Sequence, residues 1–190
     1  MRARIFLAVM ILSLAFLASC AAPKAAPEEN AEGLYVLESA IWESNAIDTC
    51  WENPSQDNEE ERALIQSEIE ATWESVSQVD FIGWAVCTRG SSGIRIQIRD
   101  EAPHTKGLGA NLDGVKNGMV LNVTFQRWGC ADASGSQTPC VFPYSGYSKE
   151  DFIRIIAVHE FGHALSFAHE QKREDTPAWC DQPHGKEGTM

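Results

Sequence analysis

The sequence is poor in basic residues and, beyond its first twenty positions, has no long hydrophobic run. Fifteen Lys and Arg stand against 27 Asp and Glu, a formal net charge of −12 at pH 7. A nucleic-acid-binding protein needs a basic face, so this charge argues against a nucleic-acid partner. No internal repeat follows residue 33, and Gly107 and Gly109 lack the strand-to-helix GxGxxG frame of a dinucleotide-binding loop. The chain of 190 residues, 44% apolar, suits one soluble domain with appendages.

The hydrophobic run that is present lies near the N-terminus, at residues 5–18. It is too short for a comfortable membrane span and follows Arg2 and Arg4, which is typical of a signal peptide. It ends in LASC, which resembles a bacterial lipobox with cleavage before Cys20 and lipid attached to the Cys20 thiol. A plain secretory signal with a chance cysteine is the alternative. We expect a lipid-anchored protein of the bacterial cell envelope, and Ala21 after the cysteine favours the outer membrane.

The chain therefore divides into three predicted parts: residues 1–20 as a lipoprotein signal peptide, 21–33 as a flexible tether rich in Ala, Pro and Glu, and 34–190 as the folded domain. An exported chain meets an oxidising environment, in which disulfides form. Cys130 and Cys140 flank a turn-rich loop and are the expected pair. Because five cysteines remain after Cys20, one is either free or has its partner outside this chain.

The periodicity of apolar residues predicts strands at 46–51, 79–87, 93–100 and 119–125. Residues 93–100 alternate between a face of Ile94, Ile96 and Ile98 and a polar face of Arg95, Gln97 and Arg99. Asn117 and Gly118 predict a hairpin turn before the last strand. With two long helices, the order of elements predicts an α+β domain whose mixed, twisted sheet packs against both helices.

Each helix is predicted from a capping pair and an apolar stripe. Asp57 and Glu60 have capping-box spacing for the first helix, and Ser148 and Asp151 for the second. The first stripe comprises Leu64, Ile65, Ile69, Thr72, Trp73 and Val76. The second comprises Phe152, Ile155, Ile156, His159 and His163, so two histidines are expected to continue a buried face.

The second helix carries the sequence HEFGHALSFAHE, residues 159–170. His159 and His163 are four residues apart, so their imidazoles project together and can bind one zinc ion. His169 lies too far along a straight helix to join them, so the helix must stop after His163 and the chain must fold back. Three histidines leave one coordination position open, as a catalytic zinc site requires. Glu160 is placed to act as the base for a water molecule activated by the zinc.

This pattern resembles the metzincin metalloendopeptidases, whose signature is HExxHxxGxxH followed by a methionine turn. HEFGHAL is similar to the matrixin version, and FAHEQKRED to the astacin version, in which Glu170, Arg173 and Asp175 match its continuation. The resemblance extends more loosely from about Ile41. It implies a metzincin-like zincin domain, His159, His163 and His169 as zinc ligands, Glu160 as catalytic base, and a protein or peptide substrate. The substrate would pair with an exposed edge strand, expected between Lys106 and Val115.

The sequence departs from the family pattern in two places. Ser166 stands where the signature has glycine, at a turn where a positive φ is expected to cost a serine on the order of 1 kcal/mol. Zinc binding can offset that strain, so the serine is expected to be tolerated but to lower stability or metal affinity. A Ser166→Gly variant is therefore expected to bind zinc at least as tightly. The other departure is that Met190 is the methionine after the helix and has no chain beyond it to form a turn. We therefore expect the C-terminal subdomain to be incomplete.

Other interpretations stay open. The three histidines and Glu160 can be structural, or Glu187 can replace His169 as third ligand. His104 near Asp113 can mark a second metal site. Glu170, Arg173 and Asp175 are expected to support the chain after the third ligand. The expected function is zinc-dependent hydrolysis of peptide bonds in extracytoplasmic proteins, and the alternative is a weakly active or inactive zinc-binding surface lipoprotein.

Overall fold

The computed structural model describes residues 35–132 and 134–169. The strands are β1 (Ala46–Trp51), β2 (Asp80–Val86), β3 (Ile94–Ile98), β4 (His104–Thr105), β5 (Met119–Leu121), β6 (Cys130–Ala131) and β7 (Gln137–Thr138). The helices are α1 (Glu59–Ile69), α2 (Lys149–Ala164), the π-helical turn η3 (Glu70–Glu74) and the 3-10 turns η1 (Glu38–Ala40), η2 (Gln56–Asn58) and η4 (Gly109–Leu112). The predicted α+β class is confirmed.

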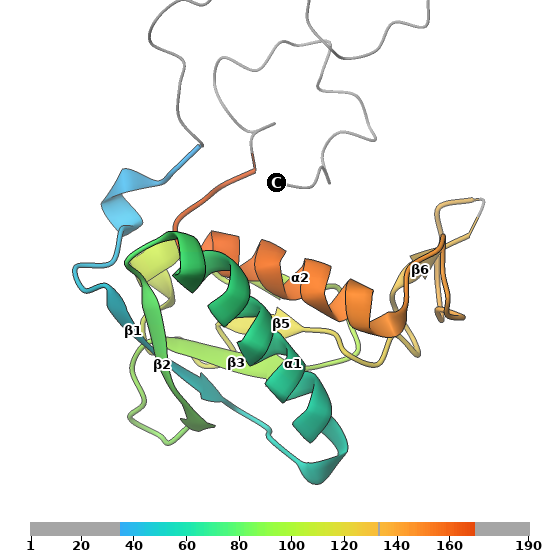
Figure 1. Cartoon of the computed structure of the whole chain (residues 1–190), viewed down its shortest axis with the longest axis horizontal. Coiled ribbons are helices and arrows are strands. Elements are labelled where there is room, and N and C mark those ends of the chain that lie inside the picture. Colours follow the sequence, from blue (N-terminus) through green and yellow to red (C-terminus); the bar gives the residue numbers. More distant parts are fainter. Residues whose placement is uncertain (1–34, 133, 170–190) are drawn as a thin grey trace, which may run out of the picture.

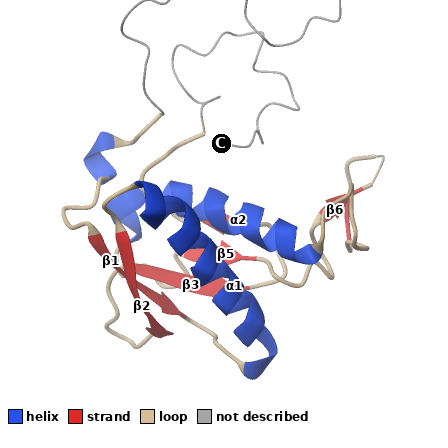
Figure 2. Ribbon diagram, in the orientation of Figure 1, coloured by secondary structure: helices blue, strands red, loops and turns tan. Residues whose placement is uncertain are grey.

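Five strands form one mixed sheet in the order β2-β1-β3-β5-β4. β1 runs parallel to β2 and β3, and β3 runs parallel to β5, whereas β4 pairs antiparallel with β5. Both long helices cover one face of this sheet (Figure 1). β6 and β7 form a separate two-stranded ribbon beyond the N-terminal end of α2 (Figure 2). β4 is therefore an edge strand of the main sheet.

The core lies between the sheet and the two helices. From α2 it receives Ile153, Ala157, Phe161 and Ala164, all at most 2% exposed and spaced three or four residues apart. Phe161 meets the ring of Phe81 edge-on, with centroids 4.9 Å apart. Such packing fixes the rotation of α2 about its axis, and with it the direction of every side chain on the opposite face of the helix.

The two long helices also hold each other. The indole nitrogen of Trp73, in the turn η3 that follows α1, donates to the carbonyl of Val158 at 3.0 Å. Lys149 forms an ion pair with Glu61 at 2.7 Å, and a further ion pair joins the helices between Arg154 and Glu68. α2 is therefore held against the first helix at its start and along its middle.

The polar side of β3 is buried at Arg95 and half-buried at Gln97. β3 is the central strand of the sheet, and Arg95 is 6% exposed. Its Nε donates to Oε1 of Glu52 at 2.9 Å, and the backbone amide of Asn117 donates to the same oxygen at 3.1 Å. Burial of the arginine is possible because its charge is paired and hydrogen-bonded.

The predicted hairpin turn at Asn117 and Gly118 is wrong, because the strand after it does not pair antiparallel with the strand predicted before it. β5 spans Met119–Leu121 and runs parallel to β3, so it does not return along that strand. Its antiparallel partner is β4, from which it is separated by residues 106–118. Asn117 does adopt the positive φ, 50°, that made the pair resemble a turn.

The start and end of α1 also differ in detail from the prediction. The capping box is formed by Ser55 and Asn58, ahead of Asp57 and Glu60. Ile65 and Ile69 are buried as predicted, but Val76 is 80% exposed. The π-helical turn η3 widens the helix before Val76, so later residues rotate away from the buried stripe.

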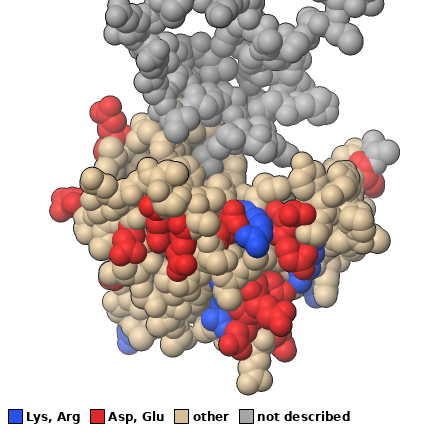
Figure 3. Space-filling model, in the orientation of Figure 1, with Lys and Arg blue, Asp and Glu red and all other residues tan. Residues whose placement is uncertain are grey.

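Two disulfides cross-link the described part of the chain. Cys130–Cys140 confirms the predicted pair, and Cys50–Cys87 ties β1 to the residue after β2. Cys180 lies outside the described residues. Acidic side chains gather over the helical face (Figure 3), in keeping with the net charge. Within residues 35–132 and 134–169, no helix is long and apolar enough to cross a membrane.

Candidate metal centre

The helix that carries the site begins at a fixed residue. Ser148 and Asp151 form the predicted capping box: Ser148 N donates to Asp151 Oδ2 at 2.8 Å, and Asp151 N donates to Ser148 Oγ at 3.1 Å. These bonds satisfy backbone groups that the first turn leaves unpaired. Because the start is fixed, His159 and His163 fall on the last two turns of α2.

The stripe that contains the histidines faces a cleft, although it was predicted to face the core. Ile155 is 51% exposed, and Phe152, Ile156 and His159 are only partly buried. These four side chains line a cavity of about 850 Å³. α2 therefore has two apolar faces, and helical spacing alone does not distinguish a face packed against the sheet from one that forms the wall of a cleft.

Three imidazoles converge at the end of α2. His163 Nε2 lies 3.0 Å from His169 Nε2, which in turn lies 3.2 Å from His159 Nε2. The ligand atoms of all three lie within 4.8 Å of one another. A tetrahedral zinc ion bound at 2.0–2.1 Å would hold its nitrogens about 3.3 Å apart, so the spacing fits such an ion. Among the described residues, this is the one group of three or more ligand-type side chains that could hold a metal ion.

The turn after α2 brings the third histidine back. The helix ends at Ala164, and Ser166 takes a φ of 78°, the positive value predicted for the signature glycine. Ser166 N still donates to the carbonyl of His163, at 3.0 Å. The reversal lets Phe167 O lie 2.8 Å from His163 Nδ1. Since a carbonyl can only accept, Nδ1 carries the proton and the lone pair of Nε2 points to the centre.

Glu160 lies beside the three histidines and is 4% exposed. Its Oε2 is buried and has no hydrogen-bond partner among the described residues. Burial raises the pKa of Glu160 from 4.5 to about 8. A buried carboxyl oxygen without a partner is costly unless it meets a ligand, and a water molecule held at the open position of a metal would be such a partner.

The same environment disfavours a proton on His159. Burial, with the nearby His163 and His169, lowers the pKa of His159 to about 4. At neutral pH the imidazole of His159 is therefore neutral, the protonation state in which nitrogen ligands bind zinc. The donor set and its spacing fit a zinc ion with one open position.

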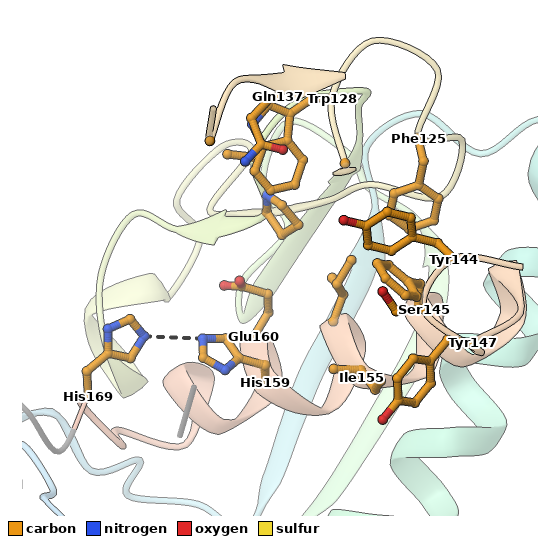
Figure 4. A pocket seen from close by; sticks show the side chains of 16 residues that line it. Phe125, Trp128, Gln137, Tyr144, Ser145, Tyr147, Ile155, His159, Glu160 and His169 are labelled. Atoms are coloured by element: carbon orange, nitrogen blue, oxygen red, sulfur yellow. Dashed lines mark hydrogen bonds between the residues drawn. The ribbon is translucent and has the colours of Figure 1, made fainter. Parts of the chain in front are cut away.

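The cleft extends to both sides of this centre. On one side an aromatic wall is formed by Phe125, Trp128, Tyr144, Tyr147 and Phe152. Figure 4 shows His159, Glu160 and His169 at one end of this half and the ring of Tyr147 at the other. The other half, about 550 Å³, is lined by β4 and residues 106–108. Both halves share Pro103, His159, Glu160 and His169, so the cleft is continuous across the histidines.

Several predicted features take another form or lie elsewhere. The edge strand is β4 (His104–Thr105), and residues 109–112, within the predicted 106–115 stretch, form η4. His104 and Asp113 belong to no group of three or more ligand-type side chains among the described residues: His104 Nδ1 lies 2.8 Å from Ala102 O, and Asp113 Oδ1 accepts from Gly93 N at 2.6 Å. The predicted residues outside the described part of the chain are Cys20, Glu170, Arg173, Asp175, Glu187 and Met190.

Two parts of the site were not predicted from the sequence. The aromatic wall takes Trp128, Tyr144 and Tyr147 from a stretch with no helical or strand periodicity to reveal a common face. The other is the segment Tyr35–Trp42, which contacts the turn between His163 and His169. Both depend on contacts between residues far apart in the chain, for which no short sequence pattern gives a signal.

Comparison with known proteins finds partial matches among solved structures. No protein-family model matches the chain, and no curated protein does. Two solved structures of myroilysin superpose on it with TM-scores of 0.49 and 0.41, each at 19% sequence identity. The alignments cover 75% and 72% of this chain, but 58% and 49% of the myroilysin chains, so this chain spans about half of their length. Likeness at this level says nothing about activity, which has to be inferred from the site itself.

Proposed function

We propose that the protein is a zinc-dependent endopeptidase of the metzincin type that cleaves proteins outside the cytoplasm. The observation that carries the proposal is the convergence of His159, His163 and His169 on one point, with the buried carboxyl of Glu160 beside it. Three neutral imidazoles would hold the ion and leave one position open. Zinc, when bound, would supply a Lewis acid that polarises the scissile carbonyl and acidifies a water molecule.

Glu160 performs the proton transfers in this proposal. Its carboxylate accepts a proton from the attacking water as the water oxygen bonds to the carbonyl carbon. It then donates that proton to the amide nitrogen as the carbon–nitrogen bond breaks. Burial bears on both steps, since a raised pKa makes the ionised carboxylate a stronger base and lets the protonated carboxyl keep its proton until the amide nitrogen takes it.

The cleft provides a path for an extended peptide. β4 has one side paired with β5, and its residues line the cleft beside the histidines. An extended substrate can add to such an edge through backbone hydrogen bonds, which do not depend on its sequence. The aromatic wall on the other side would then accept an apolar side chain of the substrate.

Cleavage of casein by the soluble chain, residues 21–190, tests the proposal. We expect cleavage that a chelator abolishes and zinc restores. Glu160→Gln should bind zinc but not cleave. Glu150→Gln is the matched control, because Glu150 is an exposed carboxylate in the first turn of the same helix. Stoichiometric zinc without cleavage would favour the alternative, a zinc-binding surface protein, and absence of zinc binding would refute both.

We further propose that the domain is held at the bacterial envelope by lipid on Cys20, through the tether of residues 21–33. The basis is the lipobox-like sequence, since residues 1–34 lie outside the described part of the structure. Each methylene of an acyl chain contributes about 0.8 kcal/mol to membrane affinity. Labelling with a palmitate analogue in a bacterial host should mark the parent chain and not Cys20→Ala. Equal labelling of the two would exclude this anchor.

A further inference from the structure

The turn that connects the second and third histidines is bound by a distant segment, Tyr35–Trp42, here called the arm. Ala168 N donates to Tyr35 O at 2.7 Å, and Leu37 N donates to Ser166 O at 2.9 Å. Between these bonds, Val36 and Phe167 form an antiparallel bridge. The residues that lead to His169 are thus paired with the arm as a short ladder of backbone hydrogen bonds.

Two side chains strengthen this pairing. Ser166 Oγ donates to the carbonyl of Ala40 at 2.7 Å, and both residues are 0% exposed. Trp42 Nε1 donates to the carbonyl of Ala164 at 2.8 Å. The serine bond satisfies a fully buried carbonyl, and the tryptophan bond satisfies a carbonyl that the end of α2 leaves without a helical partner.

A third segment, at Gly109, packs closely against the contact between Ser166 and the arm. A Cβ atom added to Gly109 would lie 1.9 Å from Ser166 Oγ and 2.0 Å from Ala40 O. Residue 109 must therefore be glycine for the hydroxyl and the carbonyl to meet. η4, which begins at Gly109, follows directly on the residues that line the cleft beyond β4.

We infer that Ser166 is a positioning residue, whose hydroxyl fastens the turn to the arm and so holds His169 on the metal site. The inference rests on the proposed zinc centre. It changes the expectation for the departure from the family signature. Glycine would adopt a φ of 78° without strain, but it would leave the buried carbonyl of Ala40 without its donor. The serine supplies a bond that the glycine cannot.

The test is the zinc dissociation constant of the full domain, measured by competition with a chromophoric chelator. Ser166→Ala keeps the strained φ and loses the bond, so it should bind zinc about tenfold more weakly. Ser166→Gly should bind more weakly than the parent by a smaller factor, because it also loses the strain. Trp42→Phe removes the indole donor and should weaken zinc binding as well. Ser145→Ala is the matched control, since Ser145 also has a positive φ, 50°, but is exposed.

Cobalt(II) provides a second readout, because its visible absorption reports the number and geometry of its ligands. The Ser166→Ala spectrum should show a weaker tetrahedral signature than the parent, while Ser145→Ala should match the parent. A purely structural hydroxyl would lower the unfolding free energy of the metal-free chain and leave zinc affinity and cobalt spectrum unchanged, which would overturn the inference. If Ser166→Ala does not fold, Trp42→Phe decides by the same criteria. A parent chain that binds no zinc refutes the proposed metal centre itself, and this inference with it.

Discussion

Replacement of Glu160 by glutamine should stabilise the metal-free protein at neutral pH while it abolishes cleavage. The carboxyl is 4% exposed, and its pKa rises from 4.5 to about 8 on folding because burial disfavours the charge. Below pH 4.5 the carboxyl is neutral in both the folded and unfolded chains, so the stability it contributes is fully present. As the pH rises from 4.5 through 8, the Glu160 carboxyl ionises in the unfolded chain but stays protonated in the folded one. Ionisation lowers the free energy of the unfolded chain, so the contribution of the neutral carboxyl to folding stability is lost.

The size of the effect follows from the pH interval. At pH 7 the unfolded carboxyl is about 2.5 pH units above its pKa, and each unit corresponds to about 1.4 kcal/mol, so the metal-free parent loses about 3 kcal/mol relative to pH 4.5. Glutamine stays neutral at every pH and avoids this loss. Because the amide must also be desolvated, part of the gain is offset, and we expect Glu160→Gln to be about 2 kcal/mol more stable at pH 7.

Denaturant unfolding with a chelator present, followed by the fluorescence of the six tryptophans, measures this difference. Glu52→Gln is a control of opposite sign. Burial alone would raise the pKa of Glu52, but hydrogen bonds from Arg95 and the Asn117 amide lower it below its ordinary value. Ionised Glu52 therefore contributes stability above pH 4.5 that is lost as the pH falls through its folded pKa.

Glu52→Gln should consequently cost more stability at pH 7 than near pH 4. His159, whose pKa is lowered to about 4, also destabilises the folded chain as the pH falls below 6.5, but it does so in the parent and in each variant. The comparison of variant with parent removes that contribution. If Glu160→Gln differs from the parent by the same amount at pH 4.5 and pH 7, burial of the carboxyl is not what sets its pKa, and the account of Glu160 is wrong.

Three other predictions concern the metal, the core and the cleft. Zinc at about a thousand times its dissociation constant should raise the unfolding free energy by about 4 kcal/mol, and His163→Ala should abolish the rise in thermal unfolding scans; an equal rise in that variant would place the ion elsewhere. Phe161→Ala should cost about 3–5 kcal/mol in denaturant unfolding, because Phe161 is fully buried against Phe81; a loss below about 1 kcal/mol would contradict that packing. Tyr147→Ala should lower kcat/KM about tenfold for peptides with a large apolar side chain and much less for alanine-rich peptides; equal losses would argue against a selective aromatic wall.

Short sequence patterns predicted the features that depend on residues close together in the chain. β1 has the predicted bounds, and α2 starts from the predicted pair Ser148 and Asp151. The spacing of the three histidines was sufficient to predict that the chain reverses after His163, and the positive φ of Ser166 followed from the signature. In each case the cause lies within a few residues of the effect.

The features that the sequence does not reveal depend on partners far away in the chain. Arg95 is buried because Glu52 and the loop before β5 provide its counter-charge and cover, and neither is visible in the alternation of β3. Ile155 belongs to an apolar stripe, yet it faces the cleft because Phe161 and its neighbours occupy the sheet side of α2. The sequence likewise gave no reason to connect Ser166 with Ala40, which lies 126 positions earlier.

That separation has a consequence for when the group of three histidines can form. The arm and the turn it binds are the first and last described segments of the chain, and their ladder closes only after everything between them has been synthesised and folded. A chain still emerging from the ribosome would have His159 and His163 on a nascent helix without His169 in position. The third imidazole is therefore the last part of the histidine group to be placed, and an incompletely folded chain would offer a metal ion at most two of the three ligands.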